Sequence, residues 1–481
     1  MRNFFLILVF ILVSIIAKSQ NPIGLEYQTS FESINLNNYD DLLLRNSSFL
    51  LTKNRELYKF GYGLEIQESL LGEFGGLYVF GISTDLDLKL DDNSPIYLNF
   101  NGFLGGGGGA SAPDGSGLCY RYSYGFKKVI NSKSNISLRY SNLNFPNGEI
   151  SGSQFQLGFT YLIDSIFNNN LRKSNSLKQL ISFQTILMNI DEIDAHRLDD
   201  NYLSRLIGAQ YQVSINEQVN ILLRFQAAVS KNIDGFMSYY SGLSYNFFDF
   251  NKFSLKFNGL IGSCGGGSMQ SEGGLSYQLE GSLEYSINKL NLSLSSGYND
   301  SYNAPFNAHY FQIGLGRSID NRNQFDNNVL LKDISISRFI ICSGIEFRNA
   351  PDKKDYNNNQ YTEMGLILFG FAYPYRSTNI IIETRWAMLG NYGAYAEASF
   401  GLSNNIIDSR KFTLIIPLQI VIAGGGGIDV GSGFGLQSNL ILKYKISKQL
   451  SVFNSIGKID MYKGNYDPFI FNFGISQNID Y

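Results

Sequence analysis

Apolar and polar residues alternate strictly in many segments of this chain, each about ten residues long. Segment 58–67 is an example, because one face carries Tyr58, Phe60, Tyr62, Leu64 and Ile66 and the other carries polar residues and glycine. Segments 80–90 and 154–163 follow the same pattern. Successive side chains of a strand point to opposite faces, so a period of two predicts β-strands with one apolar face. The helical period never persists, and the sequence therefore predicts an all-β fold.

The composition supports this prediction and excludes some partners. The 481 residues include 49 glycines but only 9 prolines, and 14% are aromatic, which is typical of strands joined by tight turns. Charged residues make up 16%, and the net charge is −3, so the chain has no basic field for nucleic acid. Three cysteines are too few and odd in number for a disulfide scaffold, and we expect buried thiols.

Three matched sets of residues show an internal repeat. The glycine blocks begin at Gly105, Gly265 and Gly424, which are 160 and 159 residues apart. Downstream of them, QLGFTYLID, QIGLGRSID and NFGISQNID share one pattern. Anchors in the same order at a nearly constant offset indicate three copies of one unit. Each unit contains about eight alternating segments, which predicts about 24 strands in total.

These observations divide the chain into six parts. A positive start, the apolar run 4–17 and small residues at Ala17 and Ser19 predict a secretory signal peptide over residues 1–19. The three β repeats are expected at 20–164, 177–320 and 333–481. Two polar, Asn-rich joints separate them, at 165–176 and 321–332.

The last segment, FIFNFGISQNIDY, places Phe469, Phe471 and Phe473 on one face and ends in Tyr481. In this it resembles the final strand of Gram-negative outer-membrane β-barrel proteins, although Ser476 stands where that strand often has glycine. The resemblance is to the class and names no specific family. It implies an antiparallel barrel exported to the cell outer membrane, with membrane lipid and the barrel-assembly machinery as partners. In lipid every backbone group must be paired, so such a sheet must close.

Two questions of architecture stay open at this stage. We favour one transmembrane barrel of about 24 strands, and the alternative is three tandem eight-stranded barrels. The wide barrel would need gating, or a plug or periplasmic partner protein. The expected function is a channel, or a structural or assembly component of the membrane. The alternative is a secreted, soluble three-domain β protein that acts as an adhesin or binding module and hides its apolar faces in cores.

The glycine blocks are predicted to be structural corners. We expect each block to follow the fifth strand of its unit and precede the sixth, so that three equivalent hairpins face one another across a lumen. The acidic residues Asp114, Glu272 and Asp429 would mark the turn. The corner residues are Gly105, Gly106, Gly107, Gly265, Gly266, Gly267, Gly424, Gly425 and Gly426.

Catalytic and metal chemistry find little support. His196 lies in a charged stretch that is better explained as a solvated loop, and His309 lies at a strand entrance. GGGGIDV occurs once, whereas calcium-binding repeats need many consecutive copies. We therefore predict a non-enzymatic protein without a cofactor or metal. The charges expected to face a lumen are Lys59, Glu65, Asp85, Asp87 and Lys89.

Overall fold

The computed structural model describes residues 23–480 except 37–38, 92–93, 110–111, 164–178, 191–202, 231–232, 234, 268, 320–337, 351–362 and 376–377. The signal peptide, both joints, His196 and Tyr481 therefore lie outside the described residues. No helix in the described part of the chain is long and apolar enough to span a membrane.

The described chain contains 24 antiparallel strands in three closed barrels of eight. Barrel 1 contains β1 (Ile23–Ile34), β2 (Leu42–Asn54), β3 (Tyr58–Leu71), β4 (Tyr78–Lys89), β5 (Ile96–Gly108), β6 (Cys119–Val129), β7 (Ser134–Asn144) and β8 (Ser151–Ile163). Barrel 2 contains β9 (Gln179–Ile190), β10 (Leu203–Ser214), β11 (Val219–Ala228), β12 (Met237–Phe250), β13 (Phe253–Gly265), β14 (Leu275–Ile287), β15 (Leu290–Ser301) and β16 (Asn307–Ile319). Barrel 3 contains β17 (Arg338–Asn349), β18 (Met364–Tyr375), β19 (Thr378–Leu389), β20 (Ala396–Asp408), β21 (Phe412–Gly424), β22 (Phe434–Lys445), β23 (Leu450–Met461) and β24 (Phe469–Asp480).

This closure corrects the arrangement that the sequence favoured. One barrel of about 24 strands would pair β1 with β24, but β1 pairs with β8, β9 with β16, and β17 with β24. The alternative of three tandem barrels is the observed one. Eight strands already enclose a space that side chains can fill, so each repeat satisfies its own edge strands without the others.

The strands are apolar outside and polar inside. On β8, Phe155, Leu157 and Phe159 are 71%, 59% and 43% exposed, whereas the intervening Gln156 is fully buried. β14 alternates in the same way, with Leu279 and Leu283 exposed and Glu280 buried. This polarity is the reverse of the arrangement that the soluble alternative requires, in which the apolar faces would form the cores.

The two ends of each barrel differ. We call one end the turn end, where the connections are short, for example residues 251–252 between β12 and β13 and 288–289 between β14 and β15. The opposite end is the loop end, where connections are longer, for example 109–118 between β5 and β6 and 425–433 between β21 and β22. The glycine blocks therefore lie at the loop end.

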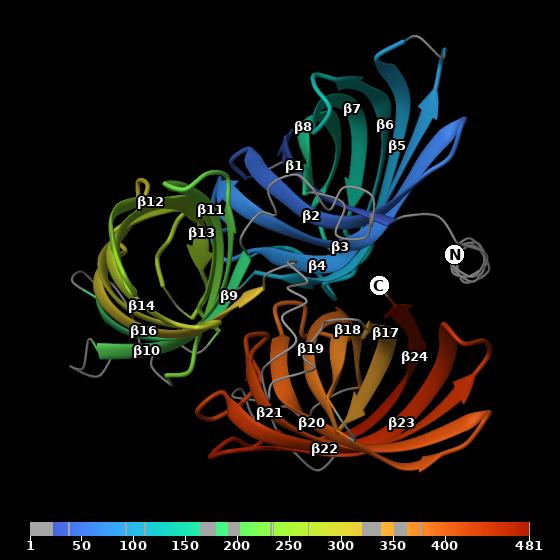
Figure 1. Ribbon diagram of the computed structural model, residues 1–481. Helices are drawn as coiled ribbons and strands as arrows, with labels where there is room; N and C mark the ends of the chain where they lie inside the picture. The colour runs from blue at the N-terminus through green and yellow to red at the C-terminus, as the bar shows by residue number, and fades with distance from the viewer. Residues whose placement is uncertain are drawn as a thin grey trace, which may run out of the picture.

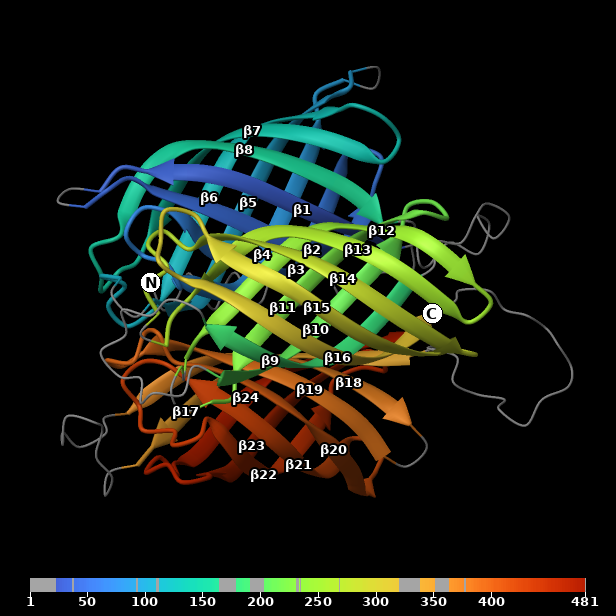
Figure 2. The same ribbon diagram turned by 90° about the vertical axis from the view of Figure 1, so that its left-hand side faces the viewer.

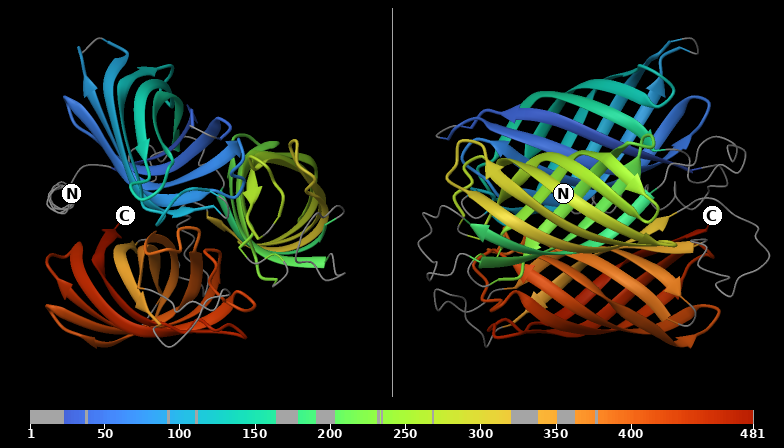
Figure 3. Two further views of the ribbon diagram at one scale, coloured as in Figure 1. Left: turned by 180° about the vertical axis from the view of Figure 1, so that it is seen from behind. Right: turned by 60° about the vertical axis from the view of Figure 1, so that its left-hand side comes forward.

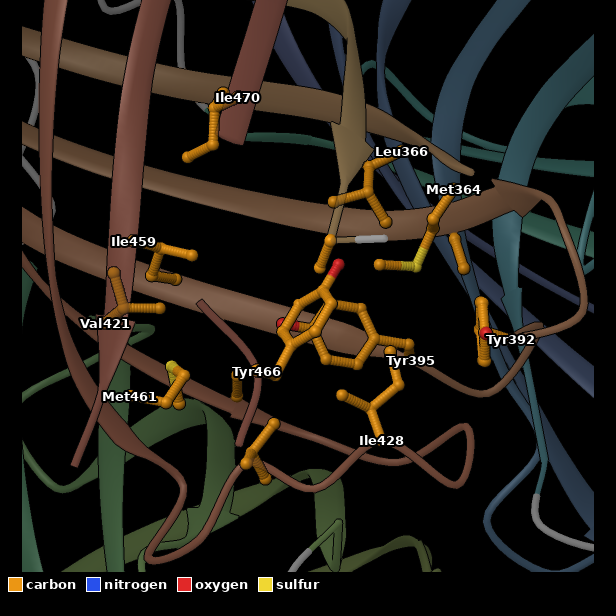
Figure 4. Packing of buried hydrophobic residues seen from close by; sticks show 14 residues of the cluster. Met364, Leu366, Tyr392, Tyr395, Val421, Ile428, Ile459, Met461, Tyr466 and Ile470 are labelled. Atoms are coloured by element: carbon orange, nitrogen blue, oxygen red, sulfur yellow. The ribbon is translucent and has the colours of Figure 1, made fainter. Parts of the chain in front are cut away.

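The three barrels lie side by side around a common centre (Figure 1 and the left view of Figure 3). Figure 2 shows them from the side, with the strands of all three slanting across the molecule. Each barrel also encloses an apolar cluster towards its loop end. In barrel 3 the rings of Tyr395 and Tyr466, 5.9 Å apart, lie within this cluster near Met364, Leu366 and Ile428 (Figure 4).

Candidate functional site: filled lumens and glycine seams

Charged side chains of β3, β4 and β6 meet inside barrel 1. Glu65, Asp85 and Asp87 are each 2% exposed. Lys127 Nζ on β6 lies 2.8 Å from Oδ1 of Asp87 and also binds Asp85. The amide of Asn99 donates to both carboxylates, at 3.0 and 2.6 Å. These carboxylates are therefore neutralised and hydrogen-bonded within the protein.

Lys59 and Lys89, the other two charged residues that the sequence predicted to face a lumen, lie nearer the turn end. Lys59 Nζ is 2.7 Å from Oε1 of Glu26 and 3.5 Å from Oδ2 of Asp87, and its side chain is 18% exposed. Lys89 is the last residue of β4 and is exposed. The structure thus brings four of the five selected charges into the barrel and leaves Lys89 at its rim.

An arginine crosses the lumen of barrel 1. Arg121 Nη1 on β6 lies 2.8 Å from Oε1 of Glu65 on β3 and 3.4 Å from Oε1 of Glu32 on β1. These strands are not neighbours in the sheet, so the contacts span the interior.

Barrel 2 is crossed in the same way. Arg224 on β11 forms a two-pronged pair with Glu280 on β14, at 2.8 and 2.9 Å. Tyr310 on β16 donates to Glu280 at 3.0 Å, and Gln210 accepts from Arg224 Nε at 3.0 Å. Paired donors and acceptors from four strands therefore fill this cross-section.

Two arginines fill the middle of barrel 3. Arg348 Nη2 on β17 lies 2.6 Å from Oε2 of Glu397 on β20, and Arg385 Nε on β19 lies 2.8 Å from Oε2 of Glu346. All four side chains are at most 3% exposed. Together with the apolar cluster at the loop end, these pairs occupy the lumen.

The sequence interpretation missed these arginines, although it contains a signal for them. Arg224 lies on the inward face of β11, the same face as Asn220 and Gln226, and the other face of this strand is apolar. An isolated arginine among amides on the inward face of a small barrel needs an acidic partner from another strand. The pattern places Arg224 inside but does not name Glu280.

The part of the barrel 3 wall formed by β22 and β24 carries buried amide side chains whose oxygens lack hydrogen-bond partners in the described part of the chain. Gln437 and Asn439 on β22, and Asn472 on β24, have buried side-chain oxygens without a hydrogen-bond partner among the described residues. Buried amides of this kind are normally satisfied by water. This strip of the lumen is therefore suited to hydration.

The fifth strand of each repeat ends inside its glycine block. Gly105, Gly106 and Gly107 belong to β5, whereas Gly265 and Gly424 are the last residues of β13 and β21. Gly266, Gly267, Gly425 and Gly426 follow those strands. The three blocks therefore do not align by their first glycines, Gly105, Gly265 and Gly424, as the sequence suggested. The equivalent backbone bonds run from Gly107 N to Gly117 O, from Cys264 N to Gly274 O and from Ala423 N to Gly433 O.

The acidic residues after the blocks are not one structural position. The hairpin turns are closed by bonds from Gly117 N to Asp114 O, from Gly274 N to Ser271 O and from Gly433 N to Val430 O. Asp114 therefore corresponds to Ser271 and Val430. Glu272, with a φ of +46°, corresponds to Gly115 and Gly431, which both have a φ of +63°. All three hairpins need a residue with a positive φ at this position, and glycine adopts this left-handed backbone conformation most easily.

The hairpin of barrel 1 packs against barrel 3. A Cβ on Gly106 would lie 2.5 Å from Ala387 O, and one on Gly117 would lie 2.7 Å from the same atom. Phe80 on β4 contacts Phe369 and Trp386, with ring centroids 5.3 and 5.7 Å apart. Glycine is needed here because two backbones touch.

The hairpin of barrel 2 packs against barrel 1 in an equivalent way. A Cβ on Gly265 would lie 2.4 Å from Gly76 N. Gly75 N donates to Glu272 O at 2.5 Å, and the Tyr78 hydroxyl donates to Ser263 O at 2.8 Å.

The third contact closes a ring. A Cβ on Gly235 of barrel 2 would lie 3.1 Å from Gly425 N in the hairpin of barrel 3. Each hairpin thus meets the connection between the third and fourth strands of a neighbouring barrel, and the same head-to-tail contact repeats three times. We call these contacts the glycine seams. They correct the expectation that the corners face one another across a lumen, because the lumen lies inside each barrel and the hairpins meet between barrels.

A buried ion pair lies in the seam between barrels 1 and 2. Arg45 on β2 and Glu68 on β3 pair on the outer face of barrel 1, yet both are at most 5% exposed. Arg45 Nη1 donates to the Ser241 hydroxyl at 3.0 Å, and its guanidinium lies 5.3 Å from the Tyr239 ring centre. Barrel 2 therefore covers the charges that this outer face carries.

Asp114 lies at the seam between barrels 1 and 3. Its Oδ2 accepts from Gly109 N at 2.7 Å, and a Cβ on Gly393 of barrel 3 would lie 2.7 Å from its Oδ1. Burial raises the pKa of Asp114 from 3.8 to about 6, against the opposing effect of the backbone donor.

The remaining chemical candidates are the three cysteines and His309. Cys119 and Cys264 are buried and Cys342 is half-buried, and all three are free thiols. His309 lies on β16, with its ring 5.0 Å from that of Tyr298. The described residues contain no group of three or more histidine, cysteine or acidic side chains that could hold a metal.

Neither a protein-family model nor a curated protein sequence matches the chain. Solved structures that it resembles are Gram-negative outer-membrane β-barrels. They include the siderophore receptor PirA from Acinetobacter baumannii, at 10% identity and a TM-score of 0.30, with 96% of this chain and 81% of that one covered. The ferric enterobactin receptor from Pseudomonas aeruginosa gives 12% identity and a TM-score of 0.31, over 96% and 82%. Pseudomonas aeruginosa OpdQ gives 9% and 0.22, over 95% and 97%. Similarity this low assigns neither a family nor a function to the chain.

Proposed function

We propose that this chain is an outer-membrane protein whose three barrels are embedded in lipid as a single-chain trimer and serve a structural or assembly role. The observation that carries the membrane assignment is the outer surface, where large apolar side chains such as Phe155 and Leu418 are exposed at strand centres. Soluble proteins rarely expose contiguous apolar surface of this extent. The alternation of apolar outside and polar inside is that of transmembrane strands.

The filled lumens support a structural role over an open channel. Arg121, Arg224 and Arg348 each make ion pairs inside their barrel, and an apolar cluster lies towards each loop end. Three narrow lumens also remove the need for the plug that one wide barrel would require. The barrel-assembly machinery and a periplasmic partner remain proposed partners, and the proposed role is non-enzymatic.

Transport is the second candidate. It is favoured by the unpaired amide oxygens of Gln437, Asn439 and Asn472, which are suited to a hydrated path in barrel 3. Such a path would pass water or a small polar solute more readily than an ion, since Arg348 and Arg385 with their paired glutamates occupy the same lumen.

Conductance distinguishes the two roles. The full chain in planar bilayers is expected to show no stepwise ion current, whereas a large, stable conductance would overturn the structural assignment in favour of a channel. Localisation is tested separately. Heat-modifiable migration and extraction only by detergent are expected, and release of the protein into the medium would contradict membrane embedding.

A further inference from the structure

The two ends of the molecule carry opposite charge. The described turn-end connections carry seven basic and three acidic residues, whereas the described loop-end connections carry nine acidic residues and one basic residue. The turn-end basic residues are Arg55, Lys133, Lys252, Lys289, Arg410, Lys411 and Lys448, and the acidic ones are Glu56, Asp91 and Glu217. The loop-end acidic residues are Asp40, Asp41, Glu73, Asp114, Glu149, Glu272, Glu363, Asp429 and Asp467, and the basic one is Lys463. The small net charge of the chain therefore hides a strong polarity along the barrel axes.

Basic residues at the turn end alternate with exposed apolar side chains. Lys252 lies between Phe250 and Phe253, which are 60% and 49% exposed. Lys411 is exposed and directly precedes Phe412, whose ring centre is 5.2 Å from that of Tyr444. Aromatic rings beside cationic side chains are typical of the level where a membrane's hydrocarbon meets its headgroups.

Two basic residues continue the lipid-facing surface itself. On the outer face of β6, Lys128 follows Phe126 after one inward residue, and both are exposed. On β16, Arg317 follows Leu315 in the same way. These cationic side chains lie at the turn-end edge of the exposed apolar outer surface, where they can reach lipid phosphates.

The charges are available for an external partner. Lys445 is held by Asp408 at 2.6 Å, but Arg410, Lys411, Lys128 and Arg317 have no ion-pair partner among the described residues. The unpaired cations occur on all three barrels and surround the same end of the molecule.

We propose that the turn end binds the phosphate groups of anionic phospholipids in the leaflet that it reaches. This inference rests on the proposed embedding of the barrels in lipid. Each basic residue near an anionic membrane surface strengthens attraction by about fivefold, the factor that corresponds to about 1 kcal/mol. Lys128, Lys252, Arg317, Arg410 and Lys411 are the binding residues.

The test compares lipids retained by the purified full chain. The protein is incubated in detergent with equal amounts of phosphatidylglycerol and phosphatidylcholine, and bound lipid is measured by native mass spectrometry. At least about fivefold enrichment of phosphatidylglycerol is expected, and it should fall on addition of salt. The combined variant Lys128→Gln, Lys252→Gln, Arg317→Gln, Arg410→Gln and Lys411→Gln should lose it.

Two controls keep the outcomes distinct. The charge-preserving changes Lys128→Arg and Lys411→Arg should retain the enrichment, and so should Lys463→Gln at the loop end. Equal binding of the two lipids by a heat-modifiable wild-type protein would overturn the proposal without affecting membrane embedding. Displacement of the lipid by millimolar inorganic phosphate would show a free-anion site and also overturn it. Failure to require detergent at all would instead refute the proposed function.

Discussion

Gly106 shows how a single residue determines whether two barrels can dock. A side chain there would enter the backbone of β19, because its Cβ would lie 2.5 Å from Ala387 O. Gly106→Val is expected to destabilise the seam between barrels 1 and 3 by about 1–3 kcal/mol or more, since the contact is backbone and cannot yield. The measurement is the temperature at which the folded band disappears on a gel. Gly281→Val on β14 is the matched control, because nothing lies within 4 Å of its Cβ position, and an equal loss there would contradict the seam.

Asp114 makes this seam sensitive to pH. Its folded-state pKa is raised from 3.8 to about 6, so its contribution to stability is full below about pH 4 and is lost as the pH rises through 6. The rise corresponds to about 3 kcal/mol at most. Asp114→Asn is therefore expected to stabilise the protein above pH 6 and to flatten the pH dependence of unfolding between pH 4 and 7. Glu73→Gln at an exposed loop-end position should leave the profile unchanged, and a variant profile that matches wild type would refute the effect.

At the scale of strands, the lumen is organised by ion pairs that join strands far apart in the sheet. Arg224→Met is expected to destabilise barrel 2 by about 3–5 kcal/mol, because it leaves Glu280 buried without a cation. The double variant Arg224→Met with Glu280→Leu should recover most of this loss, since it removes both charges. Thermal unfolding of Arg224→Met, of Glu280→Leu and of the double variant gives the coupling between the residues. Additive losses would show that the pair does not act as a unit.

The repeated hairpins also show how far element-level prediction reached. The alternating pattern predicted the strands and which side chains share a face, and the repeat predicted equivalent glycine hairpins. Aligning the three blocks by their first glycines was wrong. The strand β5 continues through its block to Gly108, whereas β13 and β21 end at the first glycine of theirs, Gly265 and Gly424. Block length and strand length vary independently, and only the backbone bonds identify Gly107, Cys264 and Ala423 as equivalent.

For the whole molecule, the glycine seams predict that the barrels remain associated without their covalent joints. Protease sites placed in joints 165–176 and 321–332 should be cut to give three fragments that still migrate together in mild detergent. Adding Gly106→Val should weaken the association of the first and third fragments and leave that of the first and second. Complete separation of wild-type fragments after cleavage would show that the joints, not the seams, hold the assembly together.

The sequence by itself determined the all-β class, the threefold repeat and the common face of residues such as Asp85 and Asp87, because the period of two assigns each side chain to one of two faces. Whether the apolar face pointed outward, and whether 24 strands closed once or three times, depended on which strands paired. That choice is tertiary, since the pairing of β1 with β8 or with β24 leaves the local pattern unchanged. The partners of Arg121 and Arg224, and the meeting of Gly106 with Ala387, likewise arise only from closure and docking, which bring together residues that no local period relates.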